Sequence, residues 1–421
     1  MKPASFSILG SIATFSRKKS DHDYSVAIFC PRLTLTFGIA AAITLFASPA
    51  LGKDFDRPRS TVLEFEILGD GDYLAIPVNI KGKEYAFVLD TGCSVSALDK
   101  SLISLTEGPS TFESVGMTKS DEILEFRSAP MMKAKGVILT PAEKITILDL
   151  SLLRKASAQE CFGIIGMDCL KVFTLVIDLD GRRVYFCDPP RHRKLDTPTA
   201  PPIPLKYNEN QLPQIEVEVG KKHYLFTLDS GDSGSGYIGI DSEPEMRNLL
   251  YQFSSIGIES DAKGTTTQSE NVRCRLLKAG NVTVSDALFG FGKSNQLGLL
   301  FFRRYRTTLR FDTDEAFFEG TKYALDYDHS DWHGIELGSS SEGRLVVVDV
   351  LAKSLGSKSG IMKGDEIVSL GKFKVRPYRY PDVILALKVG RHEDQVLTVM
   401  RGGSQKQLIL PGEALTRRML D

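Results

Sequence analysis

The chain has 421 residues, of which 42% are hydrophobic and 25% are charged, a composition typical of globular proteins with two to four folding units at this length. Its 52 lysine and arginine residues oppose 53 aspartate and glutamate residues, so the formal net charge is -1. This even balance gives no electrostatic reason to expect a nucleic acid partner, and no nucleic-acid-binding function is predicted.

The N-terminal part of the chain contains an uncharged apolar run at residues 33–52. Arg32 directly precedes this run, and small residues at Ser48 and Ala50 fit a signal-peptidase site after Ala50. A run of this length can also span a bilayer and remain as an anchor. Residues 1–52 are therefore predicted to be a signal peptide or a membrane anchor. Either role implies an exported protein, periplasmic or extracellular, that is released or held at the membrane.

Six cysteines and six histidines are spread along the chain without a spacing typical of metal sites. Neither a metal site nor a cofactor is predicted. The cysteine pattern does not indicate a disulfide framework, although an oxidising compartment would permit one disulfide within the first part of the chain.

Beyond residue 52, the chain reads as short strands separated by Gly, Asp and Asn turns, and its most informative feature is an internal repeat. GKEYAFVLDTGCS at residues 82–94 aligns without gaps with KKHYLFTLDSGDS at residues 221–233, at an offset of 229 − 90 = 139. GMDCLKVFTLVIDLDGRRVYF from Gly166 aligns with GLLFFRRYRTTLRFDTDEAFF from Gly298, at an offset of 298 − 166 = 132. These two ordered matches predict two copies of one β-rich lobe.

The repeat also predicts the domain organisation. We expect a first lobe at residues 60–190 and a second lobe at residues 205–325, joined by a Pro-rich linker at residues 191–204. A unit with a different pattern follows at residues 332–412. The expected fold class is mostly β, with two related lobes that meet at a cleft and a smaller β-rich module.

Each predicted lobe carries an Asp-Thr/Ser-Gly turn directly after an apolar strand. One such tripeptide is a weak signal, because Asp and Gly are common turn residues. Here Asp90 and Asp229 occupy equivalent positions of the repeat. A Gly-containing apolar segment follows each of them, with Gly166 at 166 − 90 = 76 residues and Gly298 at 298 − 229 = 69 residues. The combination indicates one site built from two lobes.

With FVLDTGCS and GIIGMD in the first lobe, and FTLDSGDS and NQLGLL in the second, the chain resembles the pepsin/retropepsin-like aspartic proteases. The resemblance implies a two-lobed aspartic-protease-like β-barrel fold that hydrolyses a polypeptide substrate with water, without metal or cofactor. In that family two facing carboxyl groups share a proton: the ionised one activates the water and the protonated one polarises the peptide carbonyl. The matching residues are Asp90 and Asp229 as the catalytic pair, supported by Thr91, Gly92, Ser230 and Gly231.

The second lobe departs from the family pattern. Asp232 stands directly after the turn, where a small neutral residue is usual; it could raise the pKa values of the pair, but the simpler expectation is that it points to solvent. Gln296 replaces a usual aliphatic residue, and no flap tyrosine is secure between residues 105 and 140. The alternative function is therefore a catalytically degenerate scaffold that binds peptides. Cys93, at the equivalent place in the first lobe, is interpreted as a small buried residue rather than a redox centre.

The last unit contains SLGSKSGIMKGDEIV at residues 354–368, and this stretch resembles bacterial PDZ domains. The resemblance implies an α+β domain that adds an extended peptide to a sheet edge and captures its C-terminal carboxylate. The other interpretation is a module that only packs on the lobes. The leading hypothesis is an exported aspartic endopeptidase whose PDZ-like domain recruits substrate or partner peptides. The peptide-binding candidates, by position in HGIEL, are Gly334, Ile335, Glu336 and Leu337.

Overall fold

The computed structural model describes the chain between residues 62 and 411, with gaps. Within that range the undescribed residues are 68–72, 118–119, 142, 152, 155–159, 188–197, 235, 240–241, 247–248, 261–265, 322–333, 341, 351, 353, 377–382, 384–386 and 388–393. The predicted leader at residues 1–52 and the first half of the predicted linker, residues 191–197, lie outside the described residues. Within the described ranges, no helix combines the length and apolar character that a membrane span requires.

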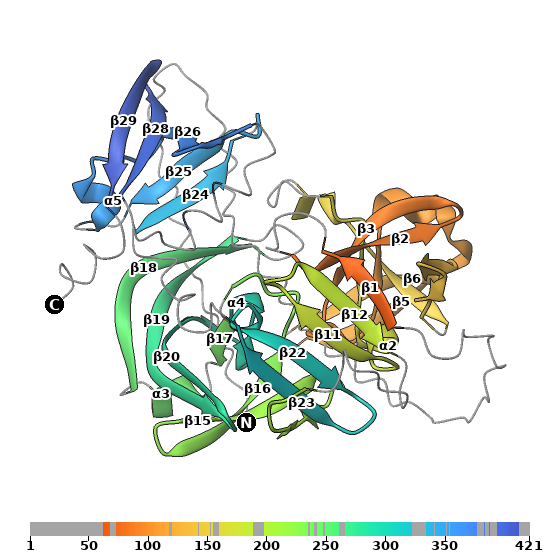
Figure 1. Cartoon of the computed structure of the whole chain (residues 1–421). Helices are drawn as coiled ribbons and strands as arrows, with labels where there is room; N and C mark the ends of the chain where they lie inside the picture. Colours follow the sequence, from red (N-terminus) through yellow and green to blue (C-terminus); the bar gives the residue numbers. More distant parts are fainter. Residues whose placement is uncertain are drawn as a thin grey trace, which may run out of the picture.

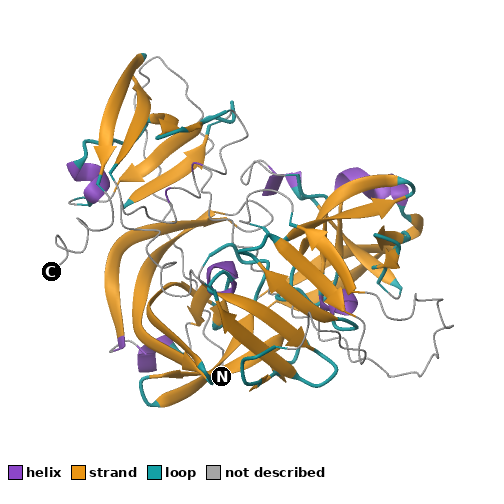
Figure 2. Cartoon of the chain, viewed as in Figure 1, coloured by secondary structure: helices purple, strands orange, loops and turns teal. Residues whose placement is uncertain are grey.

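Strands dominate the described chain, which confirms the expected mostly β class (Figure 2). They form four sheets, and Figure 1 shows two β-rich lobes with a shared sheet between them and a further unit, in blue, at the C-terminal end. The α-helices described in full are single turns: α2 (Met167–Leu170), α3 (Glu243–Met246), α4 (Leu299–Phe302) and α5 (Leu355–Lys358).

The first lobe is built on a nine-stranded sheet. Its strands are β2 (Ala75–Ile80), β3 (Lys83–Leu89), β4 (Ala97–Asp99), β5 (Glu107–Met117), β6 (Ser120–Ser128), β7 (Met132–Ala134), β8 (Val137–Ile138), β9 (Lys144–Leu148) and β10 (Gly163–Ile165), and the 3₁₀ helix η1 (Lys100–Leu105) follows β4. Strands β2 and β3 form a tight hairpin in which both central residues, Lys81 and Gly82, have positive φ. This is the turn geometry that matches the twist of two antiparallel strands.

The second lobe repeats this plan with an eight-stranded sheet. Its strands are β14 (Lys206–Tyr207), β15 (Pro213–Val219), β16 (Lys222–Leu228), β17 (Gly236–Gly239), β18 (Leu250–Ser260), β19 (Thr266–Ala279), β20 (Val282–Gly292) and β21 (Gln296–Leu297). In both lobes the strand ahead of the Asp-Thr/Ser-Gly turn pairs in parallel with a short downstream strand, β3 with β10 and β16 with β21. The internal repeat in the sequence is therefore a repeat of topology as well.

A six-stranded sheet joins the lobes, with the strands β1 (Val62–Glu66), β12 (Arg183–Cys187), β11 (Thr174–Asp178), β22 (Tyr305–Arg310), β23 (Glu315–Gly320) and β13 (Ile203–Pro204) in this order. The end of the predicted linker is thus a strand, because β13 pairs with β23. At the centre of the sheet, Val176 of β11 pairs with Thr308 of β22. Since 308 − 176 = 132 is the offset of the repeat, equivalent residues face each other here. A pseudo-two-fold axis therefore passes through this pair and relates the lobes.

The C-terminal unit has its own sheet and its own core. Its strands are β24 (Ile335–Ser339), β25 (Leu345–Val350), β26 (Glu366–Leu370), β27 (Phe373–Lys374), β28 (Gln395–Arg401) and β29 (Ser404–Leu410). Its buried cluster, which includes Leu345, Ile367 and Leu397, shares no described residue with the large apolar core that runs through both lobes. The unit is therefore a separate packing module, whereas the two lobes share one core.

Candidate active site

The two Asp-Thr/Ser-Gly turns begin at the ends of equivalent strands. Asp90 follows β3 and Asp229 follows β16. The backbone N–H of Asp90 donates to the carbonyl of Ile165 at 3.0 Å, and that of Asp229 donates to the carbonyl of Leu297 at 2.9 Å. The Gly-containing apolar segments that the sequence singled out therefore hold the start of each turn.

Two hydroxyl groups brace the turns against each other across the lobe interface. The N–H of Thr91 donates to Ser230 Oγ, and the N–H of Ser230 donates to Thr91 Oγ1, both at 3.0 Å. Each hydroxyl also donates to a carbonyl of the opposite lobe, Thr91 to Leu228 at 2.6 Å and Ser230 to Leu89 at 2.8 Å. Because the network is buried and reciprocal, it fixes the position of one turn relative to the other.

Two glycines allow the acidic side chains to approach. A Cβ atom added to Gly92 would lie 2.3 Å from Cγ of Asp229, and one added to Gly231 would lie 2.4 Å from Cγ of Asp90. Each glycine therefore makes room for the carboxyl group of the other lobe. The structure brings together all six residues that the sequence placed at this site.

The two carboxyl groups are shielded from bulk solvent, since Asp90 is 0% and Asp229 is 1% exposed. Oδ1 of Asp90 accepts a hydrogen bond from the N–H of Gly92 at 2.8 Å, and Oδ1 of Asp229 accepts one from the N–H of Gly231 at 2.9 Å. Both Oδ2 atoms are buried, and no backbone or other donor group of the described residues hydrogen-bonds to them. A proton held between the two carboxyl groups would satisfy these atoms.

Burial changes the protonation of this pair. It raises the pKa of Asp90 to about 7, although the hydrogen bond from the N–H of Gly92 and the contact with Asp229 oppose the change. Burial also raises the pKa of Asp229 well above its usual range, and the negative charge of Asp90 adds to the effect. Two carboxyl groups coupled in this way titrate as one pair that keeps a single proton over a wide pH range. The pair can therefore offer a base and a proton donor side by side.

The position after each glycine distinguishes the lobes. Cys93 is 1% exposed and its equivalent Asp232 is 0% exposed, so the expectation that Asp232 points to solvent is wrong. The thiol of Cys93 donates to the carbonyl of Val95 at 3.0 Å. Burial, together with the charge of Asp90, raises the pKa of this thiol well above its usual range. Cys93 therefore remains a neutral packing residue, which disfavours a nucleophilic role.

A polar link that the sequence did not predict lies behind the first turn. Ser96 Oγ donates to Asp168 Oδ1 at 2.6 Å and accepts the N–H of Gly166 at 3.0 Å. The N–H of Ser96 donates to Asp168 Oδ2 at 3.0 Å, so the carboxyl group ties the turn to α2. A signal was present, because Asp168 interrupts the otherwise apolar GIIGMDCL segment, while the repeat has Leu300 at the same place.

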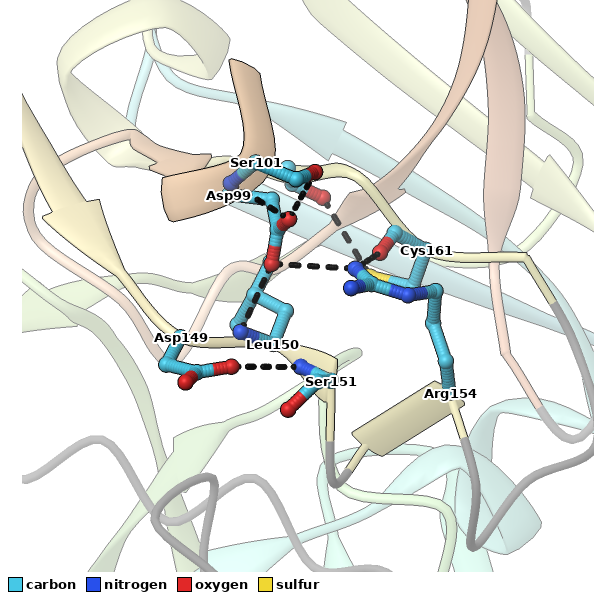
Figure 3. Close-up of polar contacts among 8 residues, drawn as sticks. Asp99, Ser101, Asp149, Leu150, Ser151, Arg154 and Cys161 are labelled. Carbon is cyan, nitrogen blue, oxygen red and sulfur yellow. Dashed lines mark hydrogen bonds and ion pairs between the residues drawn. The ribbon is translucent and has the colours of Figure 1, made fainter. Parts of the chain in front are cut away.

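A further buried carboxyl group, Asp99, organises the first lobe away from the turns (Figure 3). Its Oδ2 accepts the N–H of Leu150 at 2.7 Å and pairs with Arg154 Nη1 at 2.9 Å. Arg154 Nη1 also donates to the carbonyl of Cys161 at 2.8 Å. Burial alone would raise the pKa of Asp99, but the hydrogen bonds from Arg154, Ser101 and Leu150 outweigh it and lower the pKa. This cluster fastens the segment after β9 to the end of β4 and to the residues ahead of β10.

The peptide-binding candidates of the C-terminal unit lie at one edge of its sheet. Gly334 has a φ of +58° and directly precedes β24, the edge strand that contains Ile335 and Glu336. Leu337 is 7% exposed and belongs to the core of the unit, so only its backbone could contact a ligand.

The Gly-Asp-x-Ile motif of the C-terminal unit has a structural role. Asp365 is 0% exposed and pairs with Arg401, whose Nε and Nη2 each lie 2.6 Å from its carboxyl oxygens. Arg401 also donates to the carbonyl of Gly360 at 2.7 Å. Burial alone would raise the pKa of Asp365, but the bidentate pair with Arg401 lowers it.

The cysteines add no covalent links to this arrangement. All five cysteines among the described residues are buried, and no disulfide joins any two of them. The disulfide that an oxidising compartment would permit in the first lobe is therefore not formed in this structure. The described residues also contain no cluster of three or more His, Cys, Asp or Glu side chains that could hold a metal ion.

Comparison with known proteins adds no relative. No protein-family model matches the chain, and no curated protein matches it. A functional conclusion therefore depends on the arrangement of the two turns and of the residues around them.

Proposed function

We propose that the chain is an aspartic endopeptidase of the pepsin/retropepsin-like type, with a PDZ-like domain at its C-terminus. The observation that carries this proposal is the reciprocal packing of the turns, in which each glycine contacts the carboxyl group of the other lobe. A base and a proton donor must lie side by side to activate water, and a pseudo-two-fold pair of buried carboxyl groups that holds one proton supports that chemistry. The shared six-stranded sheet supports a two-lobed protease fold.

In the proposed reaction, the ionised member of the pair takes a proton from a water molecule as the water attacks the peptide carbonyl carbon. The protonated member donates a hydrogen bond to the carbonyl oxygen and neutralises the charge that develops there. The tetrahedral intermediate then breaks its carbon–nitrogen bond as a proton passes to the leaving nitrogen. The pair returns to its singly protonated state, and no covalent enzyme intermediate forms.

The PDZ-like unit is proposed to recruit peptides to the protease lobes. Strand β24 lies at the edge of its sheet, where an extended peptide can add as a further strand. The turn at Gly334 would direct backbone N–H groups toward a terminal carboxylate. Fluorescence anisotropy with peptides that end in a free carboxylate, compared with their C-terminal amides, tests this role. Equal binding of the two forms would contradict carboxylate capture.

The activity is tested by cleavage of an unfolded protein between about pH 3 and about pH 8, with and without pepstatin. The full chain is compared with Asp90→Asn, which keeps the shape of the side chain but cannot act as a base. Asp312→Asn is the matched control, because Asp312 is an exposed acid remote in sequence from the turns. Cleavage that persists in Asp90→Asn removes the proposed mechanism. Peptide binding without any cleavage in the unmodified chain would instead favour the degenerate scaffold.

A further inference from the structure

Asp232 adds a third buried carboxyl group to the acid pair, and it does so in one lobe only. It follows the second turn directly and is 0% exposed, at the place that Cys93 takes in the first lobe. Its N–H donates to Oδ1 of Asp229 at 3.1 Å, and its carbonyl accepts the N–H of Leu299 at 2.6 Å. The backbone therefore fixes this residue directly beside one member of the pair.

The side chain of Asp232 is held in place by two glycines. Its Oδ1 accepts the N–H of Gly234 at 2.7 Å. Its Oδ2 lies 2.5 Å from the position that a Cβ atom would take at Gly298. The carboxyl group therefore packs between the second turn and the segment that leads into α4. Any residue larger than glycine at position 298 would collide with it.

Packing alone does not require an acid at this position. The first lobe fills the equivalent place with Cys93, which is equally buried. Burying a carboxylate costs several kcal/mol of solvation free energy unless other groups compensate. An acid is therefore an unfavourable choice if its only role is to fill space. A functional reason for the acid must come from its charge, and its backbone N–H bonds directly to Asp229 of the acid pair.

The titratable and charged groups around Asp232 come from both turns and from the short helix that follows the second one. They are Asp90, Asp229 and Cys93 at the turns, and Arg303 and Arg304 at the end of α4, which begins next to Gly298. Both arginines are buried, and each takes part in interactions within the protein. The Cys93 thiol is neutral, because burial raises its pKa. A charge on Asp232 therefore acts on the pair through a medium of low polarity, where its effect is large.

We propose that Asp232 is a positioning residue that sets the working pH of the acid pair, because its negative charge keeps the shared proton in place at higher pH. The pair would then remain singly protonated at pH values where an isolated pair has lost its proton. The charge of Asp232 is indeed one of the causes that raise the pKa of Asp90, after burial. The inference rests on the proposed function, but only through the acid pair itself.

The test measures protonation of the pair directly. The full chain, labelled with ¹³C at its aspartate carboxyl carbons, is titrated by NMR between about pH 4 and about pH 9. Asp90→Asn and Asp229→Asn identify the two resonances. In Asp232→Asn and in Asp232→Cys, which copies the turn of the first lobe, the higher apparent pKa of the pair should fall by about one unit or more. An unchanged value in both variants overturns the inference.

A matched control separates this effect from a general loss of buried charge. Asp168→Asn removes a partly buried carboxyl group that faces the first turn through Ser96, and the pKa of the pair should fall less there than in Asp232→Asn. An equal fall in both variants would contradict a specific role for Asp232. Cleavage assays distinguish the two proposals: the alkaline limb of kcat/KM should move to lower pH by the same amount as the NMR value. A shifted NMR pKa in a chain that cleaves nothing refutes the proposed function and keeps the inference.

Discussion

The two lobes agree in the geometry of their turns and differ in the polar groups behind them. Thr91 and Ser230 each donate two equivalent hydrogen bonds to the other lobe, and Gly92 and Gly231 make the same contact with the opposite carboxyl group. At the next position the first lobe has a neutral thiol and the second lobe has Asp232. The comparison shows that position and charge are controlled separately: shared residues place the carboxyl groups, and unshared residues set the electrostatic environment.

Each lobe also has an acid that the other lacks, and the two come from different elements. In the first lobe Asp168 lies on α2, where Ser96 binds both of its oxygens. In the second lobe Asp232 lies on the turn itself, next to Asp229. The repeat replaces Asp168 by Leu300, so the second lobe has no equivalent link. The acid of the first lobe therefore stabilises a turn, whereas the acid of the second lobe is placed to act on the pair.

The strongest test of the shared geometry is a methyl group at either glycine. In Gly92→Ala and in Gly231→Ala, the new Cβ would lie less than 3 Å from the opposite carboxyl group, at 2.3 Å and 2.4 Å. We expect both variants to lose cleavage activity almost completely and to unfold more easily by about 1–3 kcal/mol or more. Rates of peptide cleavage and chemical denaturation measure the two effects. Gly82→Ala in the β2–β3 turn adds a Cβ that meets nothing within 4 Å, so it should lower stability only through strain at its φ of +88° and should keep cleavage activity. A large loss in one lobe only would break the equivalence of the turns.

The hydroxyl brace should matter less than the glycines but equally in both lobes. Thr91→Ala and Ser230→Ala each remove a buried hydroxyl and leave an N–H and a carbonyl of the other lobe without their partners. Each should lower the free energy of unfolding by about 1–3 kcal/mol, and the double variant should cost less than the sum because the two hydroxyls act in one network. Thr91→Ser retains the hydroxyl and should retain most of the stability. Strict additivity of the two alanine variants, measured in urea, would contradict a coupled brace.

The residues of the site that occur in both copies of the internal repeat could be predicted from the sequence. Contacts that depend on tertiary packing could not. The offset of 139 is enough by itself to identify Asp90 and Asp229 as equivalent. It could not predict that Asp232 is buried, because that depends on the absence of a side chain at Gly298, far along the chain. The link between Ser96 and Asp168 joins residues 72 positions apart, so no local pattern revealed the pairing. The sequence likewise predicts a linker where β13 forms, because this two-residue strand, Ile203–Pro204, lies in a run of prolines and carries almost no strand signal.

The pH dependence of stability sharpens the comparison between the acid pair and other carboxyl groups. The pKa of Asp90 is about 7 in the folded state, above its usual value of 3.8. The folded chain therefore binds this proton more tightly than the unfolded chain, and the resulting stability is lost as the pH rises from about 4 to about 7. Asp90→Asn should be more stable than the unmodified chain at about pH 8, by up to a few kcal/mol, and should lose this advantage at about pH 4. Thermal unfolding at both pH values measures the difference. A stability gain of the same size at both values would contradict a raised pKa.

The smallest predicted effect concerns the Asp99 cluster of the first lobe and has the opposite sign. Here the folded-state pKa is lowered, so the cluster stabilises the chain at neutral pH and this stability is lost as the pH falls through the pKa of Asp99. Arg154→Met keeps much of the side-chain volume but removes the hydrogen bonds to Asp99 and to the Cys161 carbonyl. Since Arg154 is 23% exposed and solvent screens part of the attraction, we expect a loss of about 1–2 kcal/mol at neutral pH.

The same substitution separates the framework of the first lobe from the chemistry of the pair. Arg154→Lys, which keeps the charge but not the shape of the guanidinium group, should recover only part of the lost stability. The difference between Arg154→Met and the unmodified chain should shrink as the pH falls below about 4 and through the lowered pKa of Asp99, because protonation of Asp99 then removes the ion pair of the unmodified chain. The pH profile of peptide cleavage should stay where it is, because Arg154 contacts neither turn. A cleavage profile that moves with this variant would mean that the polar groups of the first lobe also act on the acid pair, and the division between position and charge would not hold.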